Sequence, residues 1–173
     1  VKTVEKGTKF TTLDEIEREL NGKEAMVCNE CEPMCMGGIF GGKDSGIKEN
    51  TKNIFIESAY FNPVVIRKAA KYHGLQTDAS FRYERGADPN VTVYALKRVA
   101  MLIKQLAGGE ISSEVFDIYP KKIEKAKITL KYSYIDDLVG KKIERETIKE
   151  ILKELNIEII SCDEEGLVAS IPT

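Results

Sequence analysis

Short apolar runs, set off by glycines and charged residues, dominate the first third of the chain. Residues 8–13 and 24–28 are expected to form strands, and the polar residues 14–23 are expected only to separate them. The apolar run Met34–Phe40 is interrupted by two consecutive glycines, which fit a bulge or a close approach of two backbone segments. A further apolar run, Ile54–Ile56, is also predicted to be strand-like and ends at an acidic residue.

Two helices are predicted from their start and stop signals. Asn62-Pro63 places an N-cap residue before a proline at the first helical position, and Gly74 ends this helix. Asp88-Pro89 repeats the start signal, and Gly108-Gly109 ends the second helix. The apolar residues of the second helix form one stripe: Leu96, Val99, Ile103 and Leu106. Beyond this helix, Ile111–Tyr119 is expected to form a strand.

A charged linker, residues 120–127, divides the chain into two expected domains, 1–120 and 121–173. The second domain is predicted to contain strands at 127–132, 157–161 and 167–171, and helices at 133–139 and 147–155. The predicted fold class is α+β: a multilayer module with mixed β-sheets and two packed helices, followed by a small, truncated α+β domain. Because both ends of the chain are strand-like, we expect the sequence to be a fragment of a longer protein.

The composition is that of an ordinary soluble protein, with 42% hydrophobic and 31% charged residues in a chain of 173. No apolar run approaches the roughly 18 residues of a membrane helix, so no membrane association is expected. The formal net charge is −2, but residues 53–109 hold eight lysines and arginines against four acidic residues, a local +4. This basic middle segment favours a phosphate-bearing partner.

The cysteines raise the question of a metal centre. Cys28, Cys31 and Cys35 form a CxxC pair with a third cysteine four residues on, a spacing that resembles zinc and iron–sulfur motifs. Such a site needs four ligands, and Cys162 and His73 are far away in sequence. We therefore expect no metal, and free thiols in a reducing cytoplasm.

A second near match concerns phosphate binding. Gly37, Gly42 and Lys43 have the spacing of a P-loop, but that motif needs a serine or threonine next, followed by a helix. Asp44 occupies the position instead and would repel a phosphate. The glycines more plausibly allow backbone to lie close to a ligand.

The only histidine, His73, directly precedes Gly74. It is explained most simply as a residue at the C-terminal end of a helix, where the helix dipole favours a positive charge. With one histidine and no evident serine or cysteine partner, a nucleophilic catalytic triad is not expected.

Two groups of charged residues are candidates for a binding site. A carboxylate is costly next to an apolar run unless it has a partner, so Glu57 is either an ordinary strand-end residue or a functional one. Arg82, Glu84, Arg85 and Asp88 could clamp a substrate or form a buried ion network that holds a loop. For this second cluster the structural role is favoured.

Several of these segments together resemble the beta chain of bacterial phenylalanyl-tRNA synthetase, in the family's order and spacing. The matching segments are Gly41-Gly42-Lys43-Asp44-Ser45-Gly46, Asn53-Ile-Phe-Ile-Glu57-Ser58-Ala59, Asn62-Pro63 and Thr77-Asp-Ala-Ser80-Phe-Arg82-Tyr-Glu84-Arg85-Gly86-Ala-Asp88-Pro89. The resemblance implies that residues 1–120 are most of the editing module, which hydrolyses tyrosine wrongly attached to phenylalanine tRNA. Residues 121–173 then begin the small domain that follows it.

The resemblance also implies a set of substrate-binding residues. Glu57 matches the glutamate that accepts the tyrosine hydroxyl, and Gly41 matches a glycine that lines its pocket. Thr77 and Ala79 match the other wall, where the small alanine leaves room for the ring. No residue is assigned as catalytic. Thr77 is the candidate for positioning the attacking water, which can suffice because aminoacyl esters are labile.

For the whole enzyme, the resemblance implies phenylalanine tRNA and an alpha chain as partners, in a cytoplasmic α2β2 heterotetramer. ATP and magnesium belong to the synthetic site on the alpha chain, and no cofactor is expected in this fragment. A pocket histidine of the family lies upstream of the region matching Val1, so we expect the site to be incomplete here. The alternatives are a non-catalytic tRNA-docking or scaffold module and a metal or redox module.

Overall fold

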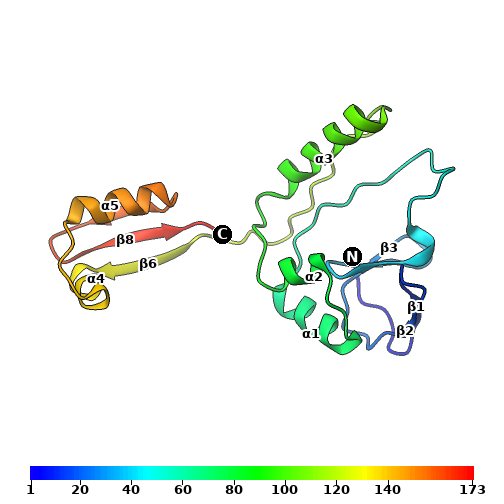
Figure 1. The fold of residues 1–173 in the computed structure, drawn as a ribbon, viewed down its shortest axis with the longest axis horizontal. Helices are drawn as coiled ribbons and strands as arrows, with labels where there is room; N and C mark the ends of the chain where they lie inside the picture. Colours follow the sequence, from blue (N-terminus) through cyan, green and yellow to red (C-terminus); the bar gives the residue numbers. More distant parts are fainter. The chain divides into compact units, whose positions relative to one another are not determined.

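The computed structural model describes all residues from 1 to 173, which divide into two units, 1–116 and 117–173 (Figure 1). Each unit combines helices with small sheets, which confirms the predicted α+β class. Every strand pair is antiparallel, so the sheets are not of the mixed type that was predicted. None of the helices combines the length and the apolar character that crossing a bilayer requires.

Five short strands form two sheets in the first unit. The first sheet pairs β1 (Lys9–Thr11) with β2 (Glu17–Glu19), and the second contains β3 (Met26–Cys28), β4 (Pro33–Met36) and β5 (Phe40–Gly41) in sequence order. A short 3₁₀ turn, η1 (Lys43–Ser45), follows β5.

The strand β2 lies in the polar segment that the sequence predicted only as a separator. Its residues are Glu17, Arg18 and Glu19, and the ladder pairs Lys9 with Glu19. The Lys9 ammonium also lies 2.7 Å from the Glu17 carboxylate. Pairs of oppositely charged residues across the two strands therefore help to stabilise a strand that has no alternating apolar pattern.

Helix α1 (Pro63–His73) begins and ends where its local signals predict. The Asn62 side chain accepts hydrogen bonds from the backbone N–H groups of Val64 and Val65, at 2.9 and 3.3 Å. Gly74 adopts a left-handed conformation with φ of 64° and caps the last carbonyls of the helix. The shorter helix α2 (Asp78–Tyr83) follows after four residues.

The core of the first unit lies between the three-stranded sheet and α1. Its buried apolar residues are Phe10, Leu20, Met26, Met36, Ile39, Phe61, Ile66, Ala69 and Ala70. The Gly37-Gly38 pair permits this packing, because a Cβ on Gly37 would lie 2.5 Å from the Phe61 ring and one on Gly38 would lie 2.9 Å from it. A Cβ on Gly37 would also lie 3.0 Å from the Ala25 carbonyl oxygen, so the predicted close approach of two backbone segments is confirmed at Gly37.

Helix α3 (Thr92–Ala107) begins later than predicted. The Asp88 carboxylate accepts a hydrogen bond from the Asn90 backbone N–H at 2.8 Å in a turn, and the helix starts only after Val91. The predicted apolar stripe is present but is not buried within the unit, and Leu106 is 81% exposed. The helix ends before the two predicted glycines.

Two predicted strands are absent from the structure. Ile54–Ile56 and Ile111–Tyr119 have no regular secondary structure, and Phe55 is 92% exposed. A strand needs a neighbour to accept and donate its ladder hydrogen bonds, and neither segment pairs with one. An apolar run alone was therefore not sufficient evidence for a strand.

The second unit is a three-stranded sheet with two helices. Its strands are β6 (Ala126–Lys131), β7 (Glu158–Cys162) and β8 (Gly166–Ile171), with β8 in the centre. Its helices are α4 (Tyr132–Val139) and α5 (Arg145–Glu154). The core consists of Tyr132, Ile148, Leu167 and Ala169. These elements agree with the predicted ranges to within two residues, although two apolar residues of the second predicted helix, Ile151 and the C-cap residue Leu155, are exposed.

Candidate functional site

The register of the β3–β4–β5 sheet places Gly41 on a defined face. Met26 pairs with Met36, and Met36 pairs with Phe40, so one cross-strand row points into the core. Side chains of neighbouring residues in a strand point to opposite faces. The other face is therefore formed by the row Val27–Cys35–Gly41, in which Cys35 lies between its two partners.

Gly41 is covered by an apolar side chain. A Cβ on Gly41 would lie 2.9 Å from Cδ1 of Leu13, whose backbone N–H also donates to the Gly41 carbonyl at 3.0 Å. Leu13 is therefore a neighbour of the candidate site that the sequence analysis did not find. Its position depends on the pairing of the β-segments, which the apolar pattern does not specify.

The segment that carries Glu57 is held by side chains on both sides of it. The Tyr83 hydroxyl donates to the Ala59 carbonyl at 3.1 Å, and the rings of Phe61 and Tyr83 pack edge to face with centroids 5.3 Å apart. The Ser58 hydroxyl donates to the carbonyl of Thr92 at 2.8 Å. These contacts all hold residues that follow Glu57.

The Glu57 carboxylate has no hydrogen-bond or ion-pair partner. The residue as a whole is exposed, yet protein atoms crowd its carboxylate, and the loss of solvation raises its pKa above the ordinary value of 4.5. The charge of the Val1 amino group partly opposes this shift. The sequence therefore identified an unusual carboxylate, and the structure shows it without a donor.

Two other side chains lie within the electrostatic reach of Glu57. Burial raises the pKa of the Cys35 thiol to about 11, with a further contribution from the negative charge of Glu57. Burial also raises the pKa of Tyr83, and Glu57 again contributes. The charge of Glu57 therefore acts on both Cys35 and Tyr83, although the sequence analysis weighed Cys35 only as a metal ligand.

The Thr77 hydroxyl joins helix α2 to the β-sheet. It accepts a hydrogen bond from the Ser80 backbone N–H at 3.0 Å, as the N-cap of α2, and donates to the Ile39 carbonyl at 2.7 Å. Ile39 lies directly before β5, so this bond fixes the start of α2 beside the strand that carries Gly41. The proton of the Thr77 hydroxyl is therefore engaged with protein, and one lone pair of its oxygen remains.

The structure thus brings two of the four predicted site residues, Gly41 and Thr77, to one hairpin, and Glu57 acts on this hairpin electrostatically. Gly41 pairs with Cys35, on which the charge of Glu57 acts, and Thr77 bonds the turn between β4 and β5. Ala79 is half-buried in the first turn of α2, two residues after Thr77. Their roles in binding remain predictions.

His73 has a role that the sequence analysis missed. Its Nε2 lies 2.8 Å from Oε1 of Glu24, and both side chains are almost completely buried. The guanidinium of Arg18 donates to the His73 backbone carbonyl at 3.1 Å. The histidine therefore fastens the end of α1 to the loop before β3. No local signal could reveal a pair separated by 49 residues.

The arginine-rich cluster is not the buried ion network that was predicted. Arg85 pairs with Glu84 at 2.9 Å, and its guanidinium lies 3.6 Å over the Phe81 ring, but the Arg85 side chain is about half exposed. Arg82 and Asp88 are exposed residues as well.

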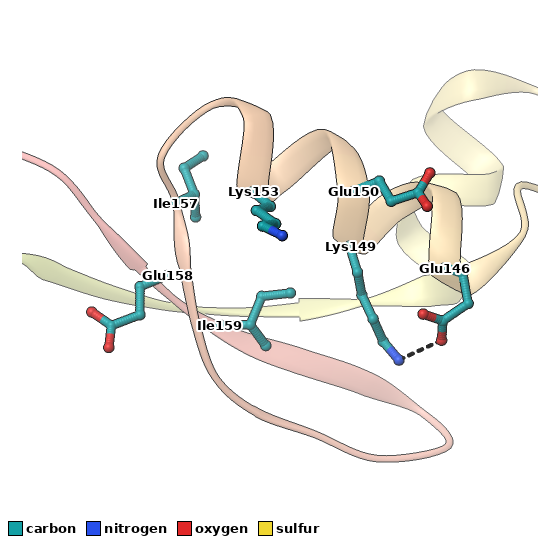
Figure 2. A pocket seen from close by; sticks show the side chains of 7 residues that line it. All are labelled: Glu146, Lys149, Glu150, Lys153, Ile157, Glu158 and Ile159. Atoms are coloured by element: carbon teal, nitrogen blue, oxygen red, sulfur yellow. Dashed lines mark hydrogen bonds and ion pairs between the residues drawn. The ribbon is translucent and has the colours of Figure 1, made fainter.

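The cysteines and cavities do not form a second chemical site. All four cysteines are free, and no group of three or more histidine, cysteine or acidic residues is arranged to hold a metal ion. An open groove of about 400 Å³ lies in the second unit between α5 and β7 (Figure 2). Its rim carries mixed charges, including an ion pair of 2.7 Å between Lys149 and Glu146.

Comparison with known proteins identifies the family of the chain. Residues 1–108 match the B3/4 domain family. The chain is 49% identical over 172 residues to the phenylalanine–tRNA ligase beta subunit of Bacteroides fragilis (strain YCH46), covering 99% of the chain and 21% of that subunit. It is 40% identical over 159 residues to the Thermotoga maritima phenylalanine–tRNA ligase beta subunit, covering 92% of the chain and 20% of that subunit.

The chain therefore spans about a fifth of the length of the curated relatives it matches. The match extends over nearly all of its residues, which confirms the resemblance to the beta chain of bacterial phenylalanyl-tRNA synthetase. The chain belongs to the B3/4 domain family, in the form that it takes in phenylalanine–tRNA ligase beta subunits.

Proposed function

We propose that residues 1–120 of this chain are most of the editing module of a phenylalanine–tRNA ligase beta subunit, and that this module in the intact ligase hydrolyses tyrosine attached to phenylalanine tRNA. An apolar pocket rejects an added hydroxyl only about 10²-fold, so a ligase for phenylalanine benefits from a second site that selects for the hydroxyl. The observation that carries the proposal is Glu57, a partly desolvated carboxylate without a donor.

The proposed selection follows from the chemistry of Glu57. An ionised carboxylate only accepts hydrogen bonds, and a tyrosine hydroxyl can donate one, whereas a phenylalanine ring offers no donor. Gly41 contributes no side chain of its own, so Leu13 forms the apolar wall over it, and Ala79 is small enough to admit the ring beside Thr77. Because loss of solvation raises the pKa of Glu57, a hydroxyl that donates to this carboxylate would replace part of the solvation it has lost.

The hydrolytic step uses water on an ester that is already labile, so binding and orientation are the main contributions of the protein. The Thr77 hydroxyl donates to the Ile39 carbonyl, which leaves its oxygen only as an acceptor for that water. The chain would act within a cytoplasmic ligase that attaches phenylalanine to its tRNA, together with an alpha chain in an α2β2 assembly. ATP and magnesium would serve the separate synthetic site.

The test compares deacylation of tyrosyl- and phenylalanyl-tRNA by the intact ligase and by its Glu57→Ala and Glu57→Gln variants. A hydrogen bond to a charged group contributes about 1.5–3 kcal/mol, which corresponds to a roughly ten- to hundredfold preference for tyrosine. Glu57→Ala should lose most of this preference and leave phenylalanine charging intact. Glu57→Gln should retain part of it, because the amide oxygen still accepts.

A Glu57→Ala variant with the wild-type preference for the tyrosyl ester would show that another group selects the hydroxyl. Equal deacylation of both esters by the wild-type ligase would contradict the editing function itself.

A tRNA-docking module is a second candidate, and helix α3 favours it. The helix carries Lys97, Arg98 and Lys104 and no acidic residue, so it could contact phosphates. Docking alone predicts salt-dependent RNA binding without a preference between the two esters. The deacylation experiment therefore distinguishes the two candidates.

A further inference from the structure

The backbone groups of the segment that ends at Glu57 are unpaired. Residues 51–62 have no regular secondary structure and run as a long open stretch that leads into α1 (Figure 1). No backbone N–H or carbonyl group of residues 53–58 takes part in a hydrogen bond. The contacts that hold this part of the chain begin only at the Ser58 hydroxyl, the Ala59 carbonyl and the Phe61 ring.

Three consecutive apolar residues of this segment are poorly covered. Ile54 is 45% exposed, Phe55 is 92% exposed, and Ile56 is half-buried. Neighbouring residues of a strand point to opposite faces, so a strand here carries apolar side chains on both faces. Strands of that kind lie within sheets that are covered on both sides. The sequence of the segment therefore suits a buried strand, whereas this chain leaves it open to solvent.

The sheet nearest in sequence offers the segment no free edge. In the β3–β4–β5 sheet, β3 carries a bridge between Met26 and Lys2, and the residue after β5, Gly42, carries a bridge to Thr12. The two outer strands of this sheet are thus already in use. A strand partner for residues 53–57 must therefore come from elsewhere.

The curated relatives contain enough further polypeptide to supply that partner. The chain corresponds to 21% of the Bacteroides fragilis subunit and to 20% of the Thermotoga maritima subunit. Unpaired backbone groups in an apolar stretch are a template for another strand, because the ladder supplies the missing hydrogen bonds. A strand of the same polypeptide is tethered to the segment, so it pairs at a high effective concentration.

We propose that residues 53–57 form a β-strand in the intact beta subunit, by pairing with a strand of the same polypeptide that lies outside residues 1–173. The proposal rests on the proposed function, because it takes the chain to be part of such a subunit. In this strand Phe55 and Glu57 share one face, and Ile54 and Ile56 share the other. The pairing fixes the direction of the Glu57 side chain, so the segment is a positioning element of the proposed site.

Amide hydrogen exchange tests the pairing in the intact ligase, without tRNA, and in the free chain. Amides within residues 54–57 should exchange at least about a hundredfold more slowly in the ligase, because ladder hydrogen bonds protect them only there. The control is the β3–β4 hairpin, which should be protected in both samples. Equally fast exchange of residues 54–57 in both samples would overturn the proposal. Protection in the free chain would also overturn it, and would assign the pairing to a second copy if it rises with chain concentration.

A photo-crosslink from position 55 identifies the partner. Phe55 is replaced by p-benzoylphenylalanine in the intact ligase, and mass spectrometry identifies the crosslinked peptide. We expect a crosslink within one beta subunit to a peptide outside residues 1–173, so that the subunit keeps its mass on a denaturing gel. A crosslink to the alpha chain or to a second beta subunit raises that mass and would overturn the proposal. A crosslink confined to residues 1–173 would overturn it as well.

Proline substitutions test the consequence for the proposed site. Consecutive strand residues direct their N–H groups to opposite sides, so either Phe55→Pro or Ile56→Pro removes a donor that faces the partner. Each is compared with alanine at the same position, which removes the side chain but keeps the N–H. In the intact ligase, at least one proline variant should deacylate tyrosyl-tRNA at least about tenfold more slowly than its alanine control. The melting temperatures of the free chains should agree within each pair, because no ladder exists there.

Proline variants of the ligase that are as active as their alanine controls would show that residues 53–57 form no strand in the subunit. A wild-type ligase that does not deacylate tyrosyl-tRNA would instead contradict the editing function. Hydrogen exchange and the crosslink would then still decide the strand pairing, because neither depends on that activity.

Discussion

Two regions of the first unit hold a carboxylate away from bulk water, and they do so in opposite ways. Glu24 is completely buried, and its oxygens accept hydrogen bonds from the backbone N–H groups of Asn21, at 2.9 Å, and Lys23, at 3.1 Å, besides the contact with His73. Glu57 is only partly desolvated, and nothing donates to it.

The two pKa shifts reflect this difference. Burial alone would raise the pKa of Glu24, but the N–H groups of Asn21, Glu24 and Lys23 and the ring of His73 together hold it below the ordinary value of 4.5. No such donors surround Glu57, so loss of solvation dominates and its pKa is raised. The comparison indicates that this fold satisfies a carboxylate where it serves stability. Glu57, an exposed residue, is left to solvent or to a ligand.

The largest effect on stability is expected when Glu24, the carboxylate with hydrogen-bond donors, is removed. Glu24→Ala leaves two backbone N–H groups and the His73 ring without their acceptor in a buried place. We expect it to lower the free energy of unfolding by about 3–5 kcal/mol. Urea denaturation of the chain measures this change. The control is Glu30→Ala, at an exposed acidic residue four positions from Met26, which should change the free energy of unfolding by no more than about 0.5 kcal/mol.

The stabilisation by Glu24 should also depend on pH with a definite sign. Because its pKa is lowered in the folded state, its contribution is present above the ordinary value of 4.5 and is lost as the pH falls through the folded pKa. A wild-type chain no more stable than Glu24→Ala at pH 7 would show that the hydrogen bonds to Glu24 contribute nothing net.

The position of Glu57 depends instead on the packing of Phe61, and a change at Gly37 tests this. A Cβ on Gly37 would lie 2.5 Å from the Phe61 ring, which cannot move freely because it is buried against Tyr83. Gly37→Ala should therefore cost about 1–3 kcal/mol of stability. In the intact ligase it should also reduce the preference for tyrosyl-tRNA.

Gly46→Ala is the matched control for this change. Gly46 has φ of −71°, and a Cβ there would lie 3.4 Å from Leu13, an ordinary contact. If Gly37→Ala and Gly46→Ala are equally stable and equally selective, the packing of Phe61 does not place Glu57.

The contrast also explains what could be predicted from the sequence. The limits of α1 were predicted because Asn62 and Gly74 act on backbone groups within a few residues. The Ile54–Ile56 strand was predicted wrongly because a strand requires a distant partner, which an apolar run does not reveal. The strand β2 was missed for the converse reason, since charged residues form it.

The candidate site shows the same division. Glu57 was singled out because a carboxylate after an apolar run is chemically unusual, and the motif carried the expectation for Gly41 and Thr77. The neighbourhood of Cys35 could not be predicted, because it depends on the register between β4 and β5. The pairing of His73 with Glu24 depends on the docking of α1 against the loop before β3, and neither residue carries a local sign of it.

The smallest expected effect is an increase in the free energy of unfolding, opposite in sign to the effect of Glu24→Ala. Glu57→Gln removes a partly desolvated charge that no donor compensates, so it should stabilise the free chain at pH 7. The gain should not exceed about 0.5 kcal/mol, because solvent screens an exposed residue.

Since the pKa of Glu57 is raised in the folded state, wild type is most stable relative to Glu57→Gln below the ordinary value of 4.5. It loses this relative stability as the pH rises through the folded pKa. Urea denaturation of both chains between pH 4 and pH 8 measures the difference. A loss of stability in Glu57→Gln at pH 7 would mean that the fold itself uses this carboxylate, and the case for a ligand at Glu57 would fail with it.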